Sequence, residues 1–518
     1  MNELEYGKIK HAFVREMHGY SRKELKEKLS CDDETLNKII RILRYKKYIK
    51  IKKREDSILD MSNVADELID VSDALANVNG YAYTFDFVGI IVLGGFIIKC
   101  YPKYILENHN PISQFKQVLK VLEKHESGQY IIKMFSERND DKNSNLLETI
   151  LFLLQDYYEN GAYSQNGVIS EHNGDGEIIW DRTVDSTIVI IDDDCPYYVD
   201  LITKQRIREE QNYFRMLHKY VLTECSRLLT EAGLFEYFDE LSPVELSEAE
   251  REDFGSDDYI LYRIERELGQ QFNTHKRIIL QALHSYIAQD KSLNDSEGVT
   301  AFGTNSFNLV WQDVCADVLE DKLHKKLRDL VPIIGPLQGE FATRGEETLK
   351  EIIAKPNWKG FSKEGQAGRT QEAKTLDPDI IGLYNVASEC CMAILDAKYY
   401  VVQFEPELKG QPGLGDITKQ YLYNLAYRKF LLAHNITSNN ITNCFLMPTE
   451  GLAVYKRGYA NMEILGFLDF IDVKNIDVIL LPAENMYRLY LNGKHFGEDL
   501  FKLLSFGNRE FYGEIIAM

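Results

Sequence analysis

The feature that most constrains the fold is an apolar run with acidic residues on both sides and a lysine just behind the second. It reads LDPDIIGLYNVASECCMAILDAKYY and begins at Leu376. Pro378-Asp379 precedes the run, and Asp396-Ala397-Lys398 closes it. Apolar and aromatic residues continue through 399–402. This pattern predicts a metal site built across a pair of strands.

The spacing of the charged residues explains this prediction. Side chains on a strand alternate between two faces, so Asp396 and Lys398 project from one face while Ala397 points away. Asp379 lies 17 residues before Asp396, enough for one strand to end, turn and return alongside. Two converging carboxylates repel each other unless a cation lies between them, and hard oxygen ligands suit Mg²⁺. The adjacent ammonium group can hold a phosphate oxygen or orient an attacking water, which suits phosphodiester hydrolysis.

The residues behind the lysine support the same interpretation. A polar, glycine-bearing loop at 405–415 leads into a predicted helix that Asp416 caps. Lys419 and Gln420 lie in its first turns, where the amide groups of a helix favour anions. The competing interpretation is an edge strand with a surface Asp and Lys pair. The apolar surroundings of the motif disfavour that alternative.

Length and composition limit the class of protein. A chain of 518 residues is too long for a single core, so we expect three or four domains. The longest apolar stretch, 87–98, is broken by glycines and falls well short of the ~20 residues of a membrane helix. The first residues are acidic and lack the apolar core of a signal peptide, and the eight cysteines form no CxxC pair. We expect a cytoplasmic protein without a membrane part.

Charge is distributed unevenly along the chain. The net charge is -21, which disfavours nucleic acid as a partner, because cations drive phosphate binding. Residues 1–55, however, carry 16 Lys and Arg against 9 Asp and Glu, a local charge of +7. The remainder therefore carries -28. One end of the chain is basic and the rest is acidic.

The basic end has the outline of a winged helix. Ser21 is a predicted N-cap, and Glu24 completes a capping box. A second helix follows Asp32-Asp33, and residues 48–52 alternate at period two, as in a strand of a basic hairpin. The apolar residues of the second helix repeat at helical spacing: Leu36, Ile39, Ile40 and Leu43.

In a winged helix the second helix can enter a DNA groove while the wing contacts phosphates. The side chains predicted to bind DNA are all basic: Lys38, Arg41, Arg44, Lys46, Lys47, Lys50, Lys52 and Lys53. The alternative is a solvated amphipathic helix pair that docks another protein. The sequence leaves both open.

Nucleotide hydrolysis within this chain is not expected. No Gly-x4-Gly-Lys-Ser/Thr motif occurs in the sequence, so we predict no nucleotide site of its own.

Several stretches together point to a known family. The acid, acid, lysine region resembles the PD-(D/E)XK nuclease superfamily, and the whole chain resembles the LlaJI family of McrC-type restriction subunits. The likeness extends over about residues 80–430 and is carried by FVGII through YPKY (87–104), GDGEIIW (174–180), LH through LTEC (217–225), FGTNSF through WQDVC (302–315) and PG through KQ (412–420).

The resemblance implies a division of labour and a set of roles. Such subunits look like the nuclease half of a two-protein restriction system, whose other half is a GTP-hydrolysing, McrB-like AAA+ ring. By resemblance, Asp379 and Asp396 are the Mg²⁺ ligands, Lys398 is the third catalytic residue, and Gln420 assists. Asp377 competes with Asp379 for contact with the metal.

One departure from the pattern concerns the first nuclease helix, about 306–327. The superfamily often supplies another acid there, whereas this sequence has Gln312. The acids left as substitutes are Asp313, Asp317 and Glu320.

We therefore predict a multidomain α/β (α+β) protein. A winged-helix-like basic domain (1–70) leads into a small β-containing domain (78–135), a mainly helical partner-docking region (136–296) and a PD-(D/E)XK nuclease domain (297–518). The expected function is Mg²⁺-dependent cleavage of double-stranded DNA as a restriction endonuclease subunit gated by the AAA+ partner. The alternatives are a non-catalytic adaptor of that partner and a winged-helix DNA-binding regulator.

Overall fold

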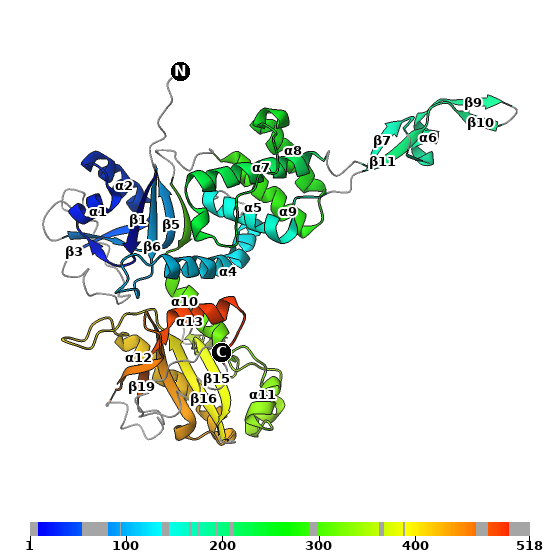
Figure 1. Cartoon of the computed structure of the whole chain (residues 1–518). Coiled ribbons are helices and arrows are strands. Elements are labelled where there is room, and N and C mark those ends of the chain that lie inside the picture. Colours follow the sequence, from blue (N-terminus) through cyan, green and yellow to red (C-terminus); the bar gives the residue numbers. More distant parts are fainter. Residues whose placement is uncertain are drawn as a thin grey trace. The chain divides into compact units, whose positions relative to one another are not determined.

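Figure 1 shows a computed structural model of the chain, which contains both helices and several sheets. It describes residues 9–53, 81–93, 95–136, 145–164, 168–174, 176–192, 195–206, 212–289, 299–361, 367–386, 389–462 and 475–496. One compact unit contains 1–9, 91–97 and 126–302, and a second contains 10–90, 98–125 and 303–518. The mixed α/β class is confirmed, while the four predicted domain ranges stay predictions.

The N-terminal helices lie where the sequence places them. Helix α1 (Arg22–Leu29) begins behind the capping box of Ser21 and Glu24. Helix α2 (Asp33–Tyr45) begins behind Asp32, whose side chain accepts the N–H of Thr35. The four apolar residues predicted for its inner face are all buried: Leu36, Ile39, Ile40 and Leu43.

The strand after α2 finds its partner far along the chain. β3 (Ile49–Lys53) pairs antiparallel with β4 (Tyr81–Phe85), and β4 also pairs with β2 (Gly19–Tyr20). A local basic hairpin would have given β3 a neighbour a few residues away, whereas Lys53 lies opposite Tyr81. Two helices and a three-stranded sheet therefore occupy this end, and the winged-helix assignment itself stays a prediction.

The apolar stretch 87–98 forms buried strands. β5 (Val88–Leu93) and β6 (Phe96–Tyr101) are buried along their whole length in a four-stranded sheet of order β1-β6-β5-β12, with β1 (Lys10–Arg15) and β12 (Val299–Thr304) at its edges. Gly303 has φ +141°, and a Cβ there would overlap the carbonyl oxygen of Val88. Within the described ranges every helix is too short or too polar to span a bilayer.

The first unit combines a helical group with short strands. Its helices include α5 (Leu146–Asn160), α7 (Tyr213–Glu231), α8 (Asp257–Gln270) and α9 (Thr274–Ala288), and α4 (Ile112–Ser136) leads into it. Between α5 and α7 lie α6 (Trp180–Ser186), a three-stranded sheet β7-β11-β8 and a hairpin β9-β10. The bounds of these strands are β7 Val168–His172, β8 Glu177–Ile178, β9 Val189–Asp192, β10 Cys195–Tyr198 and β11 Ile202–Arg206.

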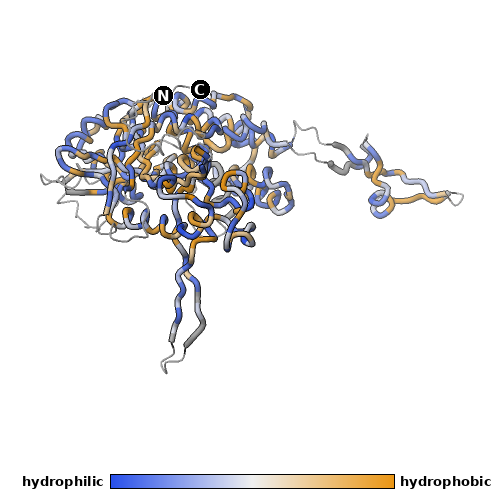
Figure 2. Tube along the Cα trace, turned by 90° about the horizontal axis from the view of Figure 1, so that it is seen from below, coloured by the Kyte–Doolittle hydropathy of each residue, from blue (hydrophilic) through white to orange (hydrophobic). Residues whose placement is uncertain are grey.

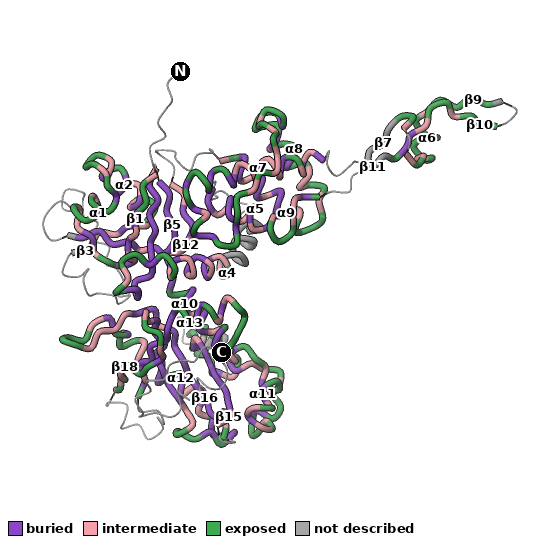
Figure 3. Tube along the Cα trace, in the orientation of Figure 1, coloured by how far each residue is buried: buried purple, intermediate pink, exposed green. Residues whose placement is uncertain are grey.

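The C-terminal part of the second unit is built on a five-stranded mixed sheet of order β15-β16-β17-β19-β18. β15 (Ile380–Val386) and β16 (Glu389–Ala397) are antiparallel, whereas β16 and β17 (Ile441–Thr449) and then β19 (Ile476–Pro482) run parallel. β18 (Tyr455–Ala460) closes the sheet antiparallel to β19. Figure 3 shows β15 and β16 as buried strands.

Helices cover this sheet as its sequence context predicts. α12 (Leu414–Ala433) and α11 (Leu327–Ile334) share a core with β15 and β16 that includes Met392, Ile394 and Tyr427. α10 (Phe307–Val318) contacts α13 (Ala483–Leu491), and the indole N–H of Trp311 donates to Leu446 of β17. A separate hairpin of β13 (Asn357–Phe361) and β14 (Ala367–Glu372) precedes β15.

Candidate active site

The β15–β16 hairpin brings the two predicted acids together. Ile380 lies opposite Leu395 in the antiparallel register, so Asp379 immediately before β15 meets Asp396 near the end of β16. An oxygen of Asp379 accepts the N–H of Ala397 at 3.0 Å. Because Met392 and Ile394 face α12 and side chains alternate, Asp396 also faces α12.

The two carboxyl groups form a buried, hydrogen-bonded pair. Asp396 is 4% exposed. Burial, a hydrogen bond to Asp396 and the negative charge of Asp396 together raise the pKa of Asp379 from 3.8 to about 8, against the opposing effects of Lys398 and the Ala397 N–H. At neutral pH the pair therefore holds a proton between its carboxyl groups.

Lys398 is joined to this pair and to a third acid. Its ammonium nitrogen lies 3.0 Å from a carboxylate oxygen of Asp396 and 3.1 Å from one of Asp416. Burial disfavours the charged lysine, but the two carboxylates outweigh it and raise the pKa of Lys398. The lysine is therefore a fixed positive charge at the end of β16.

Asp416 is a residue whose role in the site the sequence did not indicate. It was predicted only as the cap of the helix, whereas α12 begins at Leu414 behind Gly413, and Asp416 lies in the first turn with one oxygen accepting the N–H of Gly413 at 3.2 Å. Its other oxygen contacts Lys398. Only the approach of α12 to β16 places this acid beside the lysine, so no local sequence pattern predicts the contact between Asp416 and Lys398.

Gln312 occupies the place where an acid was sought. Its side-chain N–H donates to an oxygen of Asp379 at 2.9 Å. The acids that the sequence left as substitutes do not take this place: Asp313 pairs with His125 at 3.0 Å, Glu320 lies 3.7 Å from Lys322, and Asp317 is exposed. The α10 residue that contacts the carboxyl pair is thus an amide donor.

Asp377 and Asp379 differ in their contacts. Asp377 is exposed, and its carboxylate lies 2.7 Å from the ammonium group of Lys350. Asp379 faces Asp396 instead. Asp379 is therefore the acid that belongs to the cluster.

Gln420 is fully buried on α12, and neither polar atom of its side-chain amide has a hydrogen-bond partner in the described part of the chain. Its backbone carbonyl accepts the side-chain N–H of Asn443 at 3.2 Å. The structure thus leaves its amide available on the helix that carries Asp416, without a bond to the carboxyl pair.

A buried network anchors the residue after the lysine. The hydroxyl of Tyr399 donates to a carboxylate oxygen of Glu16 at 2.6 Å, and the same oxygen accepts the N–H of Lys103 at 3.2 Å. Burial raises the pKa of Glu16, while Lys103 and Tyr399 oppose that rise. Two residues separated by 383 positions are joined here, next to the end of β16.

The predicted DNA-binding residues lie apart from this cluster in the sequence and around α2 and β3 in the structure. Lys38 is exposed and lies 3.2 Å from Glu34, and Lys50 pairs with Asp86 at 2.9 Å. Arg41, Lys46 and Lys47 are exposed and Arg44 is half-buried, while the side chains of Lys52 and Lys53 lie outside the description.

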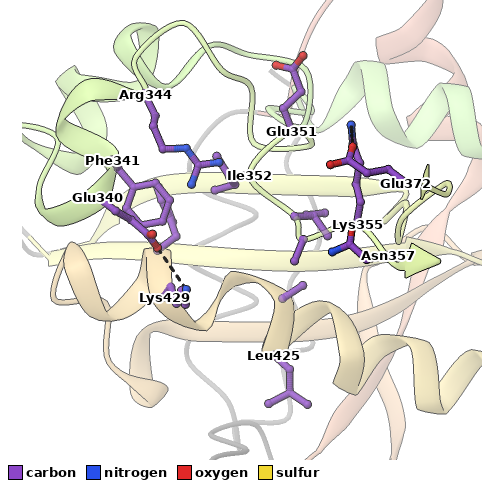
Figure 4. Close-up of a pocket in the computed structure, with 14 residues that line it drawn as sticks. Glu340, Phe341, Arg344, Glu351, Ile352, Lys355, Asn357, Glu372, Leu425 and Lys429 are labelled. Atoms are coloured by element: carbon purple, nitrogen blue, oxygen red, sulfur yellow. Dashed lines mark hydrogen bonds and ion pairs between the residues drawn. The ribbon is translucent and has the colours of Figure 1, made fainter. Parts of the chain in front are cut away.

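Figure 4 shows a pocket in the same unit, between α12 and the segment that precedes β13. Its lining is mixed in charge, and Lys429 lies 3.8 Å from Glu340 across it. None of Asp379, Asp396, Lys398 and Gln420 lines it. Across the described ranges, no group of three or more His, Cys, Asp or Glu side chains is placed to hold a metal ion, so the two acids of the pair are the acids available to one here.

Comparison with known proteins places the chain in a family. The model of the LlaJI restriction endonuclease family matches residues 87–331 and 343–484. YdjA, a component of the Type II restriction enzyme BsuMI of Bacillus subtilis (strain 168), is 28% identical over 435 residues, which cover 81% of this chain and 84% of that protein.

Two solved structures from Thermococcus gammatolerans resemble the chain loosely. One is an assembly of McrB AAA+ hexamers with bound McrC, with a TM-score of 0.40 and 13% identity over 93% of this chain and 99% of that chain. The other is an McrBC complex, with a TM-score of 0.29 and 12% identity over 58% of this chain and 84% of that chain. The family match, in contrast, covers well over half of the sequence and includes Asp379, Asp396, Lys398 and Gln420. The chain therefore belongs to the LlaJI restriction endonuclease family.

Proposed function

We propose that this chain is the DNA-cleaving subunit of a restriction system of the McrBC-like, LlaJI type. In this proposal it hydrolyses phosphodiester bonds of double-stranded DNA with Mg²⁺, once a separate GTP-hydrolysing AAA+ partner has activated it. The observation that carries the proposal is the buried pair of Asp379 and Asp396 with Lys398 bound to it. Family membership supports the class of restriction endonuclease.

The carboxyl pair fits a divalent cation. Two buried acids that share a proton resist carrying two negative charges, and a cation between them would relieve that repulsion. Mg²⁺ is commonly bound by one or two protein carboxylates, with water and phosphate oxygens completing its shell. Asp379 and Asp396 would hold the ion here. When bound, it polarises a phosphate oxygen and lowers the pKa of a water molecule.

The remaining residues of the cluster hold the reacting groups in place. Gln312 and the Ala397 N–H fix the two oxygens of Asp379. Lys398, which Asp396 and Asp416 keep charged, provides the positive charge that stabilises a phosphate during an in-line displacement.

The side-chain amide of Gln420 is assigned to a hydrogen bond that forms only when a water or the DNA is bound. A buried amide without hydrogen bonds costs about 1–3 kcal/mol, so a fold retains one where another group satisfies it. In this proposal a water or a phosphate oxygen of the DNA fills that role.

The partner-docking assignment rests on exposed apolar surface in the predicted docking region. Figure 3 shows the β9–β10 hairpin as exposed, and Figure 2 shows one of its two strands as apolar. Apolar residues of high exposure around it include Trp180 (55%), Ile188 (78%), Ile191 (70%), Tyr197 (58%) and Val199 (64%). Exposed apolar side chains that lie together commonly mark an interaction site. We assign it to the AAA+ partner, since the sequence contains no P-loop and hydrolysis of GTP must come from another chain.

The basic N-terminal end is proposed to bind DNA through the exposed face of α2 and the lysines of β3. Its local charge of +7 supports this assignment. If residues 1–70 dock a protein instead, charge reversal at Lys38 and Arg41 will leave DNA affinity unchanged and weaken assembly with the partner.

The experiment that tests the nuclease assignment is a cleavage assay with the full chain, the cognate AAA+ partner, GTP and Mg²⁺. Asp396→Asn and Lys398→Ala are expected to lower the cleavage rate by at least about 10²-fold, because the first removes an acid that would hold the metal ion and the second removes the positive charge that stabilises the phosphate. Asp377→Asn with Lys350→Ala is the matched control, since it removes an acid and lysine pair whose acid is exposed and whose lysine is half-buried. Full cleavage by either site variant refutes the assignment.

The alternative is a non-catalytic adaptor, which the amide at Gln312 in place of an acid favours. Under that alternative the native chain stimulates GTP hydrolysis by the partner but cuts no DNA with either Mg²⁺ or Mn²⁺. Assembly of each variant with the partner, measured by size-exclusion chromatography, separates loss of chemistry from loss of binding.

A further inference from the structure

The β13–β14 hairpin stands apart from the five-stranded sheet. It forms a two-stranded sheet of its own in an antiparallel register that runs from Asn357 opposite Glu372 to Phe361 opposite Ala367. Each of its described side chains is exposed on both faces of the ribbon: Asn357, Trp358, Lys359, Thr370 and Glu372. A hairpin that buries neither face against its own domain has surface to offer to another molecule.

Its charge is opposite to that of the chain. Residues 355–374 contain five Lys and Arg against two Glu, a local +3 in a chain of net charge -21. Lys359 and Lys374 are exposed. Trp358 is 68% exposed, whereas Trp311 in the same unit is fully buried. Positive side chains attract the phosphates of a nucleic acid, and an exposed indole can pack against its bases. The charge and the tryptophan of the hairpin therefore fit a nucleic acid.

The base of the hairpin is fixed to the domain. The N–H of Ala373 donates to Pro356 at 3.0 Å, and the hydroxyl of Thr375 donates to Ala354 at 2.7 Å. Lys355 pairs with Glu372 at 3.3 Å, and Figure 4 shows both at the pocket beside α12. The ribbon is therefore held at its base while its strands extend outward.

The hairpin lies within reach of DNA bound at the carboxyl pair. Glu372 precedes Asp379 by seven residues, which span at most about 24 Å when fully extended. The major groove of B-DNA is about 12 Å wide and admits a two-stranded β-ribbon. One duplex can thus contact both the ribbon and the candidate active site.

We propose that the β13–β14 hairpin is a DNA-contacting ribbon that holds the duplex while its backbone lies at Asp379 and Asp396. In this inference Lys359 and Lys374 contact phosphates, and Trp358 packs against the groove. The inference rests on the proposed function, because it takes double-stranded DNA as the substrate.

Binding of a fluorescein-labelled duplex to the full chain, measured in EDTA over a range of NaCl concentrations, tests the inference without cleavage. Loss of one phosphate contact makes the slope of log K against log salt shallower by about 0.9 and weakens binding about eightfold at about 0.1 M salt. We expect that change from Lys359→Ala and again from Lys374→Ala, and Lys359→Arg should restore the slope. Trp358→Ala should weaken binding with the slope unchanged.

One control variant and one further measurement make the result specific to the hairpin. Lys494→Ala removes an exposed lysine of the same unit and should change neither affinity nor slope. In a Trp180→Phe chain, Trp358 is the remaining exposed tryptophan, since Trp311 is buried, so its emission should change when the duplex binds.

The outcomes separate this inference from the proposed function. If the native chain binds and cuts DNA while the lysine variants keep its affinity and salt slope, the ribbon is not a DNA contact and the nuclease proposal stands. If Lys494→Ala has the same effect as the hairpin variants, the effect is one of total charge and the inference is refuted. A native chain that neither binds nor cuts the duplex overturns both.

Discussion

Replacing Asp379 with asparagine should stabilise the metal-free protein while abolishing its chemistry. In the folded chain this carboxyl keeps its proton to about pH 8, because it is buried against Asp396, whereas in the unfolded chain it releases the proton near pH 3.8. Between pH 3.8 and about pH 8, rising pH therefore favours unfolding, and the loss of folding stability caused by Asp379 is complete above pH 8. Asp379→Asn removes this loss, but its single side-chain oxygen can replace only one of the two Asp379 oxygens that accept the N–H groups of Gln312 and Ala397, so the gain is an upper bound.

The size of the effect follows from the same pKa. One pKa unit corresponds to 1.36 kcal/mol, so the variant should gain at most about 2 kcal/mol at pH 5 and about 5 kcal/mol at pH 8. The difference between the two pH values, about 3 to 4 kcal/mol, is the diagnostic quantity.

Urea unfolding in EDTA, followed through the emission of buried Trp311, measures it at both pH values. Asp377→Asn is the control, because that acid is exposed and paired with Lys350, and it should change stability by no more than about 1 kcal/mol. A gain that is the same at pH 5 and pH 8, or a loss at both, would show that the carboxyl pair does not share a proton.

Three further substitutions, with Gly360→Ala as a control for one of them, test other parts of the unit by the same urea unfolding. Tyr399→Phe should lower stability by about 1–3 kcal/mol, since it leaves the buried carboxyl of Glu16 without its hydroxyl partner, and an unchanged stability would contradict the network. Gln312→Glu adds a third acid at the carboxyl pair, so the metal-free variant should lose more stability than the native chain as pH rises, and Mg²⁺ should restore it; the same pH dependence as the native chain would argue against this geometry. Gly303→Ala should be strongly destabilising, because the added Cβ would overlap the backbone of Val88. Gly360→Ala, with open space around it, should be nearly neutral. Equal effects of the two substitutions would contradict the close approach of β12 to β5.

The structure retains what local sequence patterns indicated about the candidate site. Asp379, Asp396 and Lys398 lie within one β-hairpin, and the alternation of side chains along a strand decides which of them share a face. The capping box of Ser21 and Glu24 is equally local, because its hydrogen bonds join residues three apart. Such features follow from backbone geometry and need no knowledge of the remaining chain.

The three-dimensional contacts decided which strands and helices lie side by side, which the periodicity of apolar residues leaves open. A period-two pattern shows which face of a strand is buried but not which strand lies beside it, so β3 pairs with a strand that begins at Tyr81. In the same way the partners of the carboxyl pair and Lys398 come from α10 and α12: Gln312 is 67 residues from Asp379, and Asp416 lies on a separate helix.

The sequence by itself thus determined the acid, acid, lysine hairpin, because this depends on short-range geometry, and its resemblance to a known family indicated the restriction endonuclease family. Only the tertiary structure decided that Gln312 and Asp416 complete the cluster and that Glu16 anchors Tyr399 beside it. The physical reason is that burial and hydrogen bonding between distant segments depend on how helices pack against the sheet, which no local pattern encodes.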